Sequence, residues 1–239
     1  MSLERAPLYA RAEAELRARI VRGEWKPGEA LPTEPILAAS LGISQGTLRR
    51  ALAALEQQRL IERRQGIGTR VVEETSEREL FHFFRAETVD GSRLQPTSLI
   101  HRIERRAARS AEQRALRLTR ADRVHHLTRE RRLGGRPCLL ERISLPEPLF
   151  PGFALPTGVE LAEELYVHYQ RRYAITITRC AERLSAVAAP APVARILHLP
   201  EGTPLLLAER TALDPLGRPV EFRLSWIQTA DLRYAIDLR

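Results

Sequence analysis

Apolar residues recur at helical spacing in three separate stretches of the first sixty positions. In the first stretch they form one helical face before Gly23, made of Tyr9, Ala12, Leu16 and Ile20. Spacings of three and four residues are those of an amphipathic helix. A connector rich in proline and glycine, "EWKPGEALPTEP", comes next. The pattern therefore predicts one helix that ends before a loop.

The next two stretches predict a pair of short helices. Thr33 is a good N-cap for the segment "EPILAASLG", and Pro35 falls in its first turn, where a missing N–H costs little. This helix stops at Gly42, and Ser44 caps a third helix that begins "SQGTLRRALAALEQQ". Two short helices joined by about three residues that include a glycine are typical of a helix-turn-helix.

A hairpin is expected directly after the third helix. The runs "LIERR" and "TRVVE" flank "QGIG", whose glycines supply the positive φ angles that a tight turn needs. The sequence thus places a glycine-tipped hairpin beside the helix-turn-helix.

Polar residues separate this segment from the rest of the chain. The stretch "EETSERE", Glu73 to Glu79, has the composition of a linker. Beyond it, "LIHRIERRA" and "RVHHLTRERRLGGRPCLLERISLP" alternate like strands around a Gly-Gly turn, while "AEQRALRL" and "ELAEELYVHYQRRY" predict helices. The fold class is α+β. We expect a first domain at residues 1–73, a linker at 74–79 and a second domain at 80–239.

The second domain contains a weak internal repeat. The segment "ARSAEQRALRLTRADRVHHLTRERRLGGRP" resembles "AVAAPAPVARILHLPEGTPLLLAERTALDPLGRP", and the comparison aligns Arg129 with Arg210. Both segments predict a short helix, a turn, a strand and a Gly-Arg-Pro hairpin. Chance similarity is the alternative, but the shared order favours duplication, which would give one continuous sheet with a cleft between its halves.

The net positive charge of the chain indicates an anionic partner. The 239 residues carry a net charge of +8, with a pI of about 10.4, which favours an anionic partner. Lys26 is the single lysine, so nearly all of the positive charge comes from arginine. A general compositional bias towards arginine is therefore the alternative explanation of this charge. Between Ser44 and Arg70, however, six arginines stand against two glutamates. The positive charge is therefore concentrated on the third helix and the hairpin.

Several classes of protein are not indicated. The N-terminal stretch has no apolar signal region, and no window approaches eighteen uncharged apolar residues, so we expect a cytoplasmic protein without membrane spans. Cys138 and Cys180 lack a metal-binding or redox spacing, although the sequence leaves a disulfide open. We expect neither a cofactor nor a metal.

The third helix has the two faces that reading DNA requires. Leu48, Leu52 and Leu55 share a face that must be buried, while the opposite face is small, polar and cationic. That face consists of Gly46, Arg50, Ala53 and Gln57, flanked by Thr47 and Arg49. Small residues permit close approach to the major groove, and arginine can bind guanine with two hydrogen bonds. An ordinary helical bundle with a solvated arginine face is the alternative, which the adjacent hairpin makes less favourable.

Pro7 to Val72 resembles the N-terminal winged helix-turn-helix of the GntR family of bacterial transcription regulators. The matching segments are "PLY", "IVRGEWKPGEALPTE", "LGIS", "TLRRALAALE" and "RRQGIGTRV". The resemblance implies that Arg49 contacts bases, that Thr47 contacts phosphate, and that Gly66 at the wing tip approaches the minor groove. The full set of expected DNA-binding residues is Thr33, Ser44, Gln45, Gly46, Thr47, Arg49, Arg50, Arg64, Gln65, Gly66 and Gly68.

The chain departs from the family pattern at two positions. Pro35 and Gln45 stand where the family usually has arginine, which indicates an altered operator or weaker binding. Arg50, Arg63 and Arg64 are expected to supply replacement phosphate contacts, which depend on salt and carry no sequence information.

The segment from Leu80 to Arg239 resembles the effector-binding UTRA domain of the HutC-type branch of that family. The resemblance implies a fold like that of chorismate lyase, an antiparallel sheet with flanking helices and internal pseudo-symmetry. In "TRERRLGGRPCLLERISLP", Arg129 and Arg131 share one strand face and Glu141 lies across the turn. Two arginines facing one carboxylate suit a small anion that also carries hydrogen-bond donors. Cross-strand ion pairing at the surface is the alternative.

The expected effector-binding residues are Arg129, Arg131, Glu141, Glu164, Glu221 and Ser225. In relatives that bind phosphosugars, "S-L-Y" often stands where this chain has Glu164, Leu165 and Tyr166. A glutamate there would repel a phosphate, so the effector need not be a sugar phosphate.

A phenylalanine-rich segment and a pair of adjacent histidines do not indicate a further site. The segment "ELFHFFR", Glu79 to Arg85, can stack on bases, but core or dimer packing is favoured. His125 and His126 alternate faces on a strand and cannot easily hold one metal.

The sequence therefore predicts a dimeric regulator, a repressor by resemblance, that binds a palindromic DNA operator and responds to a small, anionic metabolite. An effector-independent DNA-binding protein is the first alternative, and an enzyme of lyase-like fold in the second domain is the other. No nucleophile–base pair, metal spacing or phosphate loop supports the enzyme. We therefore expect no catalytic residues.

Overall fold

The computed structural model describes residues 6–64, 66–75, 86–89, 91, 96–161, 164–230 and 232–236. The chain divides into two compact units. The first comprises Met1–Glu74, Thr176–Arg179 and Asp214–Arg218, and the second comprises Thr75–Ile175, Cys180–Leu213 and Pro219–Arg239. The predicted linker residues 76–79 and the segment "ELFHFFR" lie outside the described residues.

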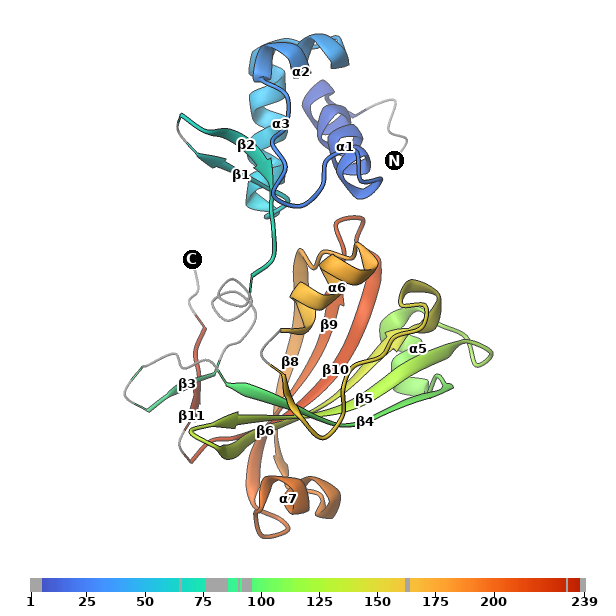
Figure 1. Ribbon diagram of the computed structural model, residues 1–239, viewed down its shortest axis with the longest axis vertical. Helices are drawn as coiled ribbons and strands as arrows, with labels where there is room; N and C mark the ends of the chain where they lie inside the picture. Colours follow the sequence, from blue (N-terminus) through green and yellow to red (C-terminus); the bar gives the residue numbers. More distant parts are fainter. Residues whose placement is uncertain are drawn as a thin grey trace. The chain divides into compact units, whose positions relative to one another are not determined.

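The first unit contains three helices and a two-stranded antiparallel sheet (Figure 1). The elements are α1 (Leu8–Val21), α2 (Glu34–Leu41), α3 (Gln45–Gln57), β1 (Ile61–Arg64) and β2 (Gly68–Val71). One apolar cluster joins them, because α1 contributes Leu16 and Ile20 while α3 contributes Leu48, Leu52 and Leu55. The three predicted helices and the hairpin are thus confirmed, and the buried leucines are those that the sequence pattern indicated.

The helix ends follow from local chemistry. Gly42 ends α2 in the left-handed conformation at φ 63°, which glycine adopts without steric cost. At the start of α3, the Ser44 side chain accepts a hydrogen bond from the Thr47 N–H at 3.2 Å. Thr33 occupies the predicted N-cap position of α2, although its side chain makes no capping hydrogen bond.

The second unit is built on a seven-stranded sheet in the order β7-β4-β5-β6-β10-β9-β8. Its strands are β4 (Thr97–Ala107), β5 (Arg123–Leu133), β6 (Arg136–Pro146), β7 (Glu160–Leu161), β8 (Arg179–Ala188), β9 (Pro204–Leu213) and β10 (Pro219–Gln228). The helices are α5 (Ser110–Leu116), α6 (Leu165–Tyr173) and α7 (Ala191–Leu197), with a 3-10 turn, η2 (Glu147–Leu149). A separate pair joins β3 (Ala86–Thr88) to β11 (Leu232–Tyr234). The predicted α+β class is confirmed.

The sheet has the internal symmetry that the repeat predicted. The order strand, helix, strand, strand occurs as β4-α5-β5-β6 and again as β8-α7-β9-β10. The two copies meet where β6 pairs with β10, and each copy continues outward from this seam in the same order. The centre of the sheet is therefore the place where equivalent strands from both copies lie side by side.

One predicted helix begins later than the sequence pattern indicated. The segment "ELAEELYVHYQRRY" was predicted to be helical from Glu160, but Glu160 and Leu161 pair with Leu99 and Ser98 as β7, and the helix begins at Leu165. Pairing with the free edge of β4 outweighs the helical propensity of these two residues.

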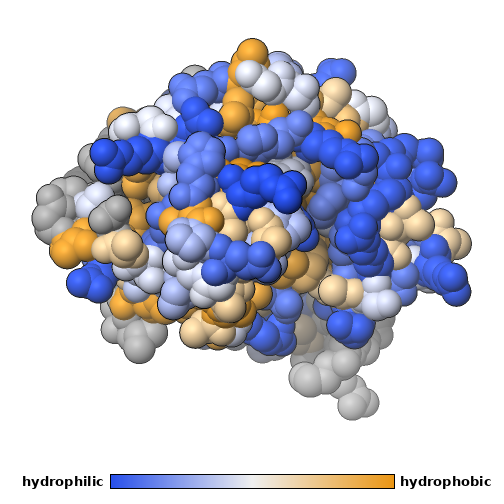
Figure 2. Space-filling model, turned by 90° about the horizontal axis from the view of Figure 1, so that it is seen from below, coloured by the Kyte–Doolittle hydropathy of each residue, from blue (hydrophilic) through white to orange (hydrophobic). Residues whose placement is uncertain are grey.

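The second unit's helices occupy different parts of the sheet. In Figure 1, α6 and α7 lie towards opposite ends of β8, β9 and β10. The side chains of α6 reach the sheet, since the Tyr169 hydroxyl donates to Glu221 on β10 at 2.8 Å. On the face of the molecule that Figure 2 shows, hydrophilic and hydrophobic side chains are interspersed, as on an ordinary protein surface.

Candidate functional site

The exposed face of α3 carries the residues that the sequence assigned to DNA. Gln45, Gly46, Arg49 and Arg50 are exposed, whereas Leu48, Leu52 and Leu55 are buried. The helix buries its leucines because they recur every three or four residues and face α1 and α2. A small, polar and cationic surface is left towards solvent.

Arg49 is held at the surface by its neighbours. Its Nε donates to a Glu34 carboxylate oxygen at 2.7 Å, and 63% of the Arg49 side chain remains exposed. A surface pair of this kind is weak, so the guanidinium can exchange Glu34 for another acceptor at little cost. The backbone carbonyl of Arg49 accepts a hydrogen bond from Arg63 at 3.1 Å, which ties α3 to the hairpin.

Arg50 has an aromatic neighbour. Its guanidinium lies over the ring of Tyr9 on α1, 4.5 Å from the ring centroid. Such a cation–π contact orients the side chain but leaves its N–H groups in the guanidinium plane for phosphate.

The hairpin has the open tip that the glycines predicted. Gly66 and Gly68 have φ angles of 76° and 100°, and a Cβ atom built at either position would meet nothing within 4 Å. Backbone conformation alone therefore requires glycine here. Beside the tip, 59% of the Arg64 side chain is exposed, and it pairs with Glu62 at 3.2 Å.

The structure brings the expected DNA-binding residues onto the elements of one unit. Those within the described residues are Thr33, Ser44, Gln45, Gly46, Thr47, Arg49, Arg50, Arg64, Gly66 and Gly68. Gln65 lies outside the described residues. The Ser44 and Thr47 hydroxyls contact one another at 2.9 Å, so both already belong to the helix cap.

In the second unit, the six expected effector-binding residues share one buried polar network. Arg129 on β5 faces Glu141 on β6, and its Nε donates to Glu141 Oε2 at 2.5 Å. Both side chains are nearly inaccessible to solvent, with residue exposures of 1% and 3%. The alternative of surface ion pairing is therefore wrong, because the tertiary fold covers this face.

Arg223 extends the network to the second repeat. It donates to Glu141 at 3.0 Å and holds Glu221 with two hydrogen bonds of 2.8 Å. The Ser225 hydroxyl reaches Glu141 at 3.5 Å. Arginine 223 was missed in the sequence analysis, although its position two residues from Glu221 puts both side chains on one strand face.

Helix α6 covers the other side of this network. The hydroxyls of Tyr166 and Tyr169 donate to the two oxygens of Glu221 at 3.2 and 2.8 Å. At the helix N-cap, Glu164 accepts two hydrogen bonds from the Arg131 guanidinium, one of them 2.8 Å long. Neither tyrosine was among the expected effector-binding residues, although Tyr166 lies only two positions after Glu164, which was.

The charges in the network stabilise one another. Burial opposes ionisation of Glu141, but the nearby charges of Arg129 and Arg223 outweigh it and hold its pKa well below the ordinary value. Burial likewise favours the neutral form of Arg129, and the Glu141 charge overcomes it, so the pKa of Arg129 is raised. Burial, followed by the charge of Glu221, raises the pKa of Tyr169 well above 10.0. The carboxylate and both guanidinium groups are therefore charged at neutral pH, and the phenol is neutral.

The Arg129 guanidinium keeps unused hydrogen-bonding capacity. Its Nη1 and Nη2 atoms are buried and have no hydrogen-bond partner among the described residues. Nη1 lies 3.5 Å from a Glu164 oxygen, an ion-pair distance rather than a hydrogen bond. Buried donors normally find an acceptor, so these two atoms mark a place where a bound molecule could contribute oxygen atoms.

The two adjacent histidines have separate surroundings. His125 packs against Phe153, with ring centroids 5.8 Å apart, whereas His126 Nδ1 lies 2.9 Å from the Ser144 hydroxyl. Within the part of the chain that the structure describes, no group of three or more histidine, cysteine, aspartate or glutamate side chains could hold a metal ion. Cys138 and Cys180 are free thiols.

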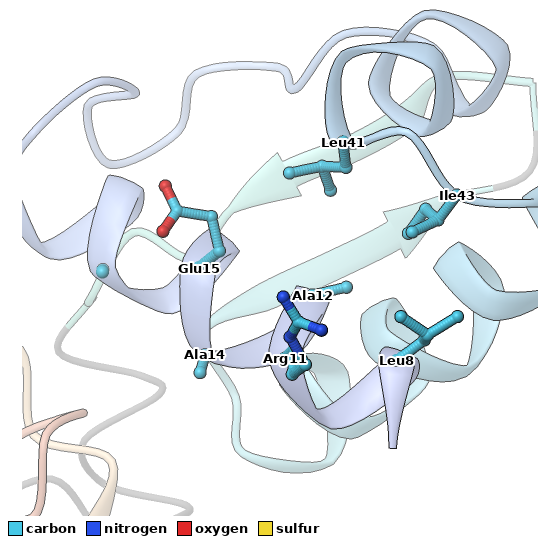
Figure 3. A pocket seen from close by; sticks show the side chains of 8 residues that line it. Leu8, Arg11, Ala12, Ala14, Glu15, Leu41 and Ile43 are labelled. Atoms are coloured by element: carbon cyan, nitrogen blue, oxygen red, sulfur yellow. The ribbon is translucent and has the colours of Figure 1, made fainter. Parts of the chain in front are cut away.

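A separate open hollow of about 530 Å³ lies in the first unit. Figure 3 shows α1 contributing Leu8, Arg11 and Glu15 to it, opposite Leu41 and Ile43 at the turn between α2 and α3. None of the expected effector-binding residues lines it. Among the described residues, no helix is long and apolar enough to cross a bilayer.

Two family models match the chain, one in each unit. Residues 8–71 match the model described as "Bacterial regulatory proteins, gntR family", and residues 91–233 match that of the UTRA domain. The resemblance inferred from the sequence motifs is thereby confirmed.

Curated relatives match along most of their length. The chain is 29% identical over 231 residues to the "Mannosyl-D-glycerate transport/metabolism system repressor MngR" of Escherichia coli K12, covering 96% of this chain and 95% of that protein. It is 30% identical over 213 residues to the "HTH-type transcriptional repressor NagR" of Bacillus subtilis, covering 86% of this chain and 84% of that protein.

Solved structures share the fold. The ligand-binding domain of a GntR-family regulator from Bordetella bronchiseptica superposes with a TM-score of 0.62 at 25% identity, covering 66% of this chain and 98% of that one. The possible transcriptional regulator YydK from Bacillus subtilis covers 95% of this chain and 99% of its own, with a TM-score of 0.58 and 16% identity.

Proposed function

The chain belongs to the gntR family of bacterial transcription regulators and carries a UTRA domain, and from this premise we propose that it is a repressor controlled by a small molecule. Its relatives MngR and NagR are named as repressors and match the chain over most of its length. The proposal has three parts, which are operator binding through α3 and the hairpin, dimerisation, and release by an effector.

Operator binding rests on the exposed face of α3. Arg49 and Arg50 are exposed near the start of a helix whose other face is packed into the core. A helix of this kind can enter the major groove with its N-terminal residues against base edges, while a wing contacts the neighbouring backbone. Arg49 is proposed to read bases, and Arg50 and Arg64 to bind phosphates.

Dimerisation follows from the kind of target. One α3 helix contacts only a few base pairs, so a two-fold dimer that reads both halves of a palindrome multiplies the specificity. Such a regulator acts on chromosomal DNA and therefore works in the cytoplasm.

The effector is proposed to bind at the buried network of the second unit. The single observation that supports this is the Arg129 guanidinium, which is 1% exposed yet has two N–H-bearing atoms without an acceptor in the described structure. A ligand oxygen there would satisfy donors that otherwise cost about 1–3 kcal/mol. A coupling of about 1–3 kcal/mol between this place and the DNA-binding unit is enough to relieve repression. The sequence predicts an anionic effector, but Glu164 already places a carboxylate beside Arg129 and Arg131.

A gel-shift titration against DNA upstream of the protein's own gene tests the proposal. We expect the parent protein to bind that DNA, and a panel of sugars and sugar derivatives to contain at least one that releases it. Arg129→Lys keeps the charge opposite Glu141 but removes the fork of donors, so it should bind DNA like the parent and resist release. The matched control is Arg102→Lys, an exposed arginine of β4, 72% exposed, which should behave as the parent in both respects.

Each alternative gives a different result. If the parent binds the DNA and no metabolite in the panel releases it, the effector-independent regulator is the better description. An enzyme is disfavoured because a general base needs a pKa near the working pH, whereas two arginines hold the pKa of Glu141 far below that range. Turnover of any panel member by the full chain would contradict this view.

A further inference from the structure

The carboxylate of Glu164 lies where the fold has assembled an anion-binding place. Glu164 is the N-cap residue of α6, a nine-residue helix, and its own side chain makes no capping hydrogen bond. Both terminal nitrogens of Arg131 donate to the two carboxylate oxygens, and Arg129 Nη1 stands 3.5 Å away. Two guanidinium groups and a helix N-terminus all favour negative charge at the same point.

This place is closed to solvent. Residue exposures are 4% for Glu164, 2% for Arg131 and 1% for Arg129. A charge in such surroundings is strongly penalised unless an opposite charge compensates it. The Glu164 carboxylate therefore serves as a buried counter-ion of Arg131.

The wider network is balanced in charge. Its guanidinium groups belong to Arg129, Arg131, Arg210 and Arg223, and its carboxylates to Glu141, Glu164, Glu182 and Glu221. The four positive charges are thus matched by four negative charges. A phosphate or carboxylate from a ligand would add negative charge beside Glu164 without a further cation to offset it.

The network nevertheless keeps hydrogen bonds to offer. Arg129 Nη1 and Nη2 lack acceptors in the described part of the chain, and Glu141 Oε2, which accepts from Arg129 Nε, can accept a second hydrogen bond. Hydroxyl groups can accept from the guanidinium and donate to this carboxylate oxygen, and they bring no charge. A molecule with several hydroxyl groups fits this mixture of donors and acceptors.

We propose that Glu164 is a built-in anion that fills the anion-binding place between Arg131 and α6, so that the effector is an uncharged, polyhydroxylated molecule such as a sugar or polyol. This rests on the proposed function, because it assigns the ligand class of the effector site named there. Glu164 is then the residue that decides specificity, since it rejects phosphorylated and carboxylated forms of the same molecule by like-charge repulsion.

The direct test uses inorganic phosphate as the probe and the full-length chain without DNA. Glu164→Ser removes the internal carboxylate and leaves Arg131 and the helix N-terminus facing an empty place. Calorimetric titration should then show phosphate binding with a Kd on the order of 1 mM, at least about tenfold tighter than in the parent. The double variant Glu164→Ser/Arg131→Gln should lose that gain, which shows that the phosphate sits at this place.

A second variant covers the case in which Glu164→Ser does not fold. Glu164→Gln keeps the shape of the side chain without its charge. The rise in Tm on replacing chloride by phosphate at equal ionic strength should be larger in this variant than in the parent, whose rise measures the general salting-out effect of phosphate. The proposal fails if the parent binds phosphate through Arg131 as tightly as the variants do, or if neither variant gains phosphate binding.

The second test compares candidate effectors in matched pairs. Each sugar in the operator-release panel is compared with its phosphate ester. The uncharged member should release the operator from the parent, and the ester should do so at least about tenfold less effectively, a difference of about 1.4 kcal/mol. Better release by the ester would overturn the assignment of ligand class. If no compound releases the operator, the proposed regulation fails, while the phosphate titration still decides the role of Glu164.

Discussion

Arg129 and Glu141 occupy facing positions on β5 and β6, and their ion pair, 2.5 Å from Nε to Oε2, is almost completely buried. Burying two charges is costly, and apolar residues of similar volume often stabilise a fold as well or better. The unused donors of Arg129 beside this pair are the feature on which the proposed effector site rests.

Removing one partner of this pair should destabilise the second unit. Glu141→Leu leaves Arg129 buried without its nearest carboxylate and should lower the free energy of unfolding by about 3–5 kcal/mol. The double variant Arg129→Met/Glu141→Leu removes both charges and should cost less than the single one. Urea titration checks this in a Trp25→Phe background, where Trp226 remains as the only tryptophan and reports on the second unit. An equal or greater loss of unfolding free energy in the double variant would contradict the view that an unpaired buried charge causes the destabilisation.

Arg49→Ala should remove sequence preference from DNA binding. The loss of a bidentate contact to a base is expected to cost about 1–3 kcal/mol at the operator and much less on unrelated DNA. Fluorescence anisotropy with operator and scrambled duplexes at one salt concentration measures the ratio. Arg102→Ala on β4 is the matched control, since it removes a similarly exposed arginine from the other unit. An Arg49→Ala protein as selective as the parent would show that α3 does not read bases through this residue.

Arg64→Ala should weaken binding evenly across sequences. Arg64 is exposed beside the hairpin tip, where a phosphate contact would release one counter-ion. The slope of log K against log salt concentration should fall by about 1, while the ratio of operator to scrambled affinity stays constant. A salt series with both duplexes provides the measurement. A change in selectivity with an unchanged slope would place the side chain at a base instead.

Acid should destabilise the second unit through His126. Burial first, and then the positive charge of Arg106, lowers the pKa of His126 to about 4, below its ordinary value of 6.5. The unfolded chain therefore binds a proton more readily than the folded one between these values, so the stability is fully present above pH 6.5 and falls as the pH drops towards 4. The loss is on the order of 1–3 kcal/mol.

His126→Gln tests this pH dependence because it keeps a hydrogen-bonding group near Ser144 but cannot take up the proton. Unfolding by urea at pH 7.5, 6, 5 and 4.5 should show a shallower fall in the variant than in the parent. The two proteins should have similar slopes above pH 7. Identical pH profiles over the whole range would assign the acid sensitivity to other groups, such as His125, whose pKa is also lowered by burial.

Local patterns predicted most of the first unit. Leucine spacing identified the buried face of α3, Gly42 and Ser44 marked the turn before it, and Gly66 and Gly68 marked the hairpin tip. These features depend on residues within one or two turns of each other, so their physical causes are visible in the sequence. Thr33 occupies the predicted N-cap position of α2, but the sequence alone did not show that its side chain makes no capping hydrogen bond.

Neighbouring elements decided the parts that were missed. Glu160 and Leu161 form a strand because the edge of β4 lies beside them, which no local pattern reveals. Tyr166 and Tyr169 reach Glu221 more than fifty residues away, through the packing of α6 on the sheet.

By itself, the sequence determined the two-part organisation, the α+β class, the helix-turn-helix with its hairpin, and the pairing of Arg129 with Glu141 across a Gly-Gly turn. Each of these depends on periodicity or on residues close along the chain. Only the tertiary structure decided that the arginine–glutamate cluster is buried, that Arg223 joins its two repeats, and that Glu164 neutralises Arg131. Burial and charge balance are sums over residues distant in sequence, and only the folded chain brings those residues together.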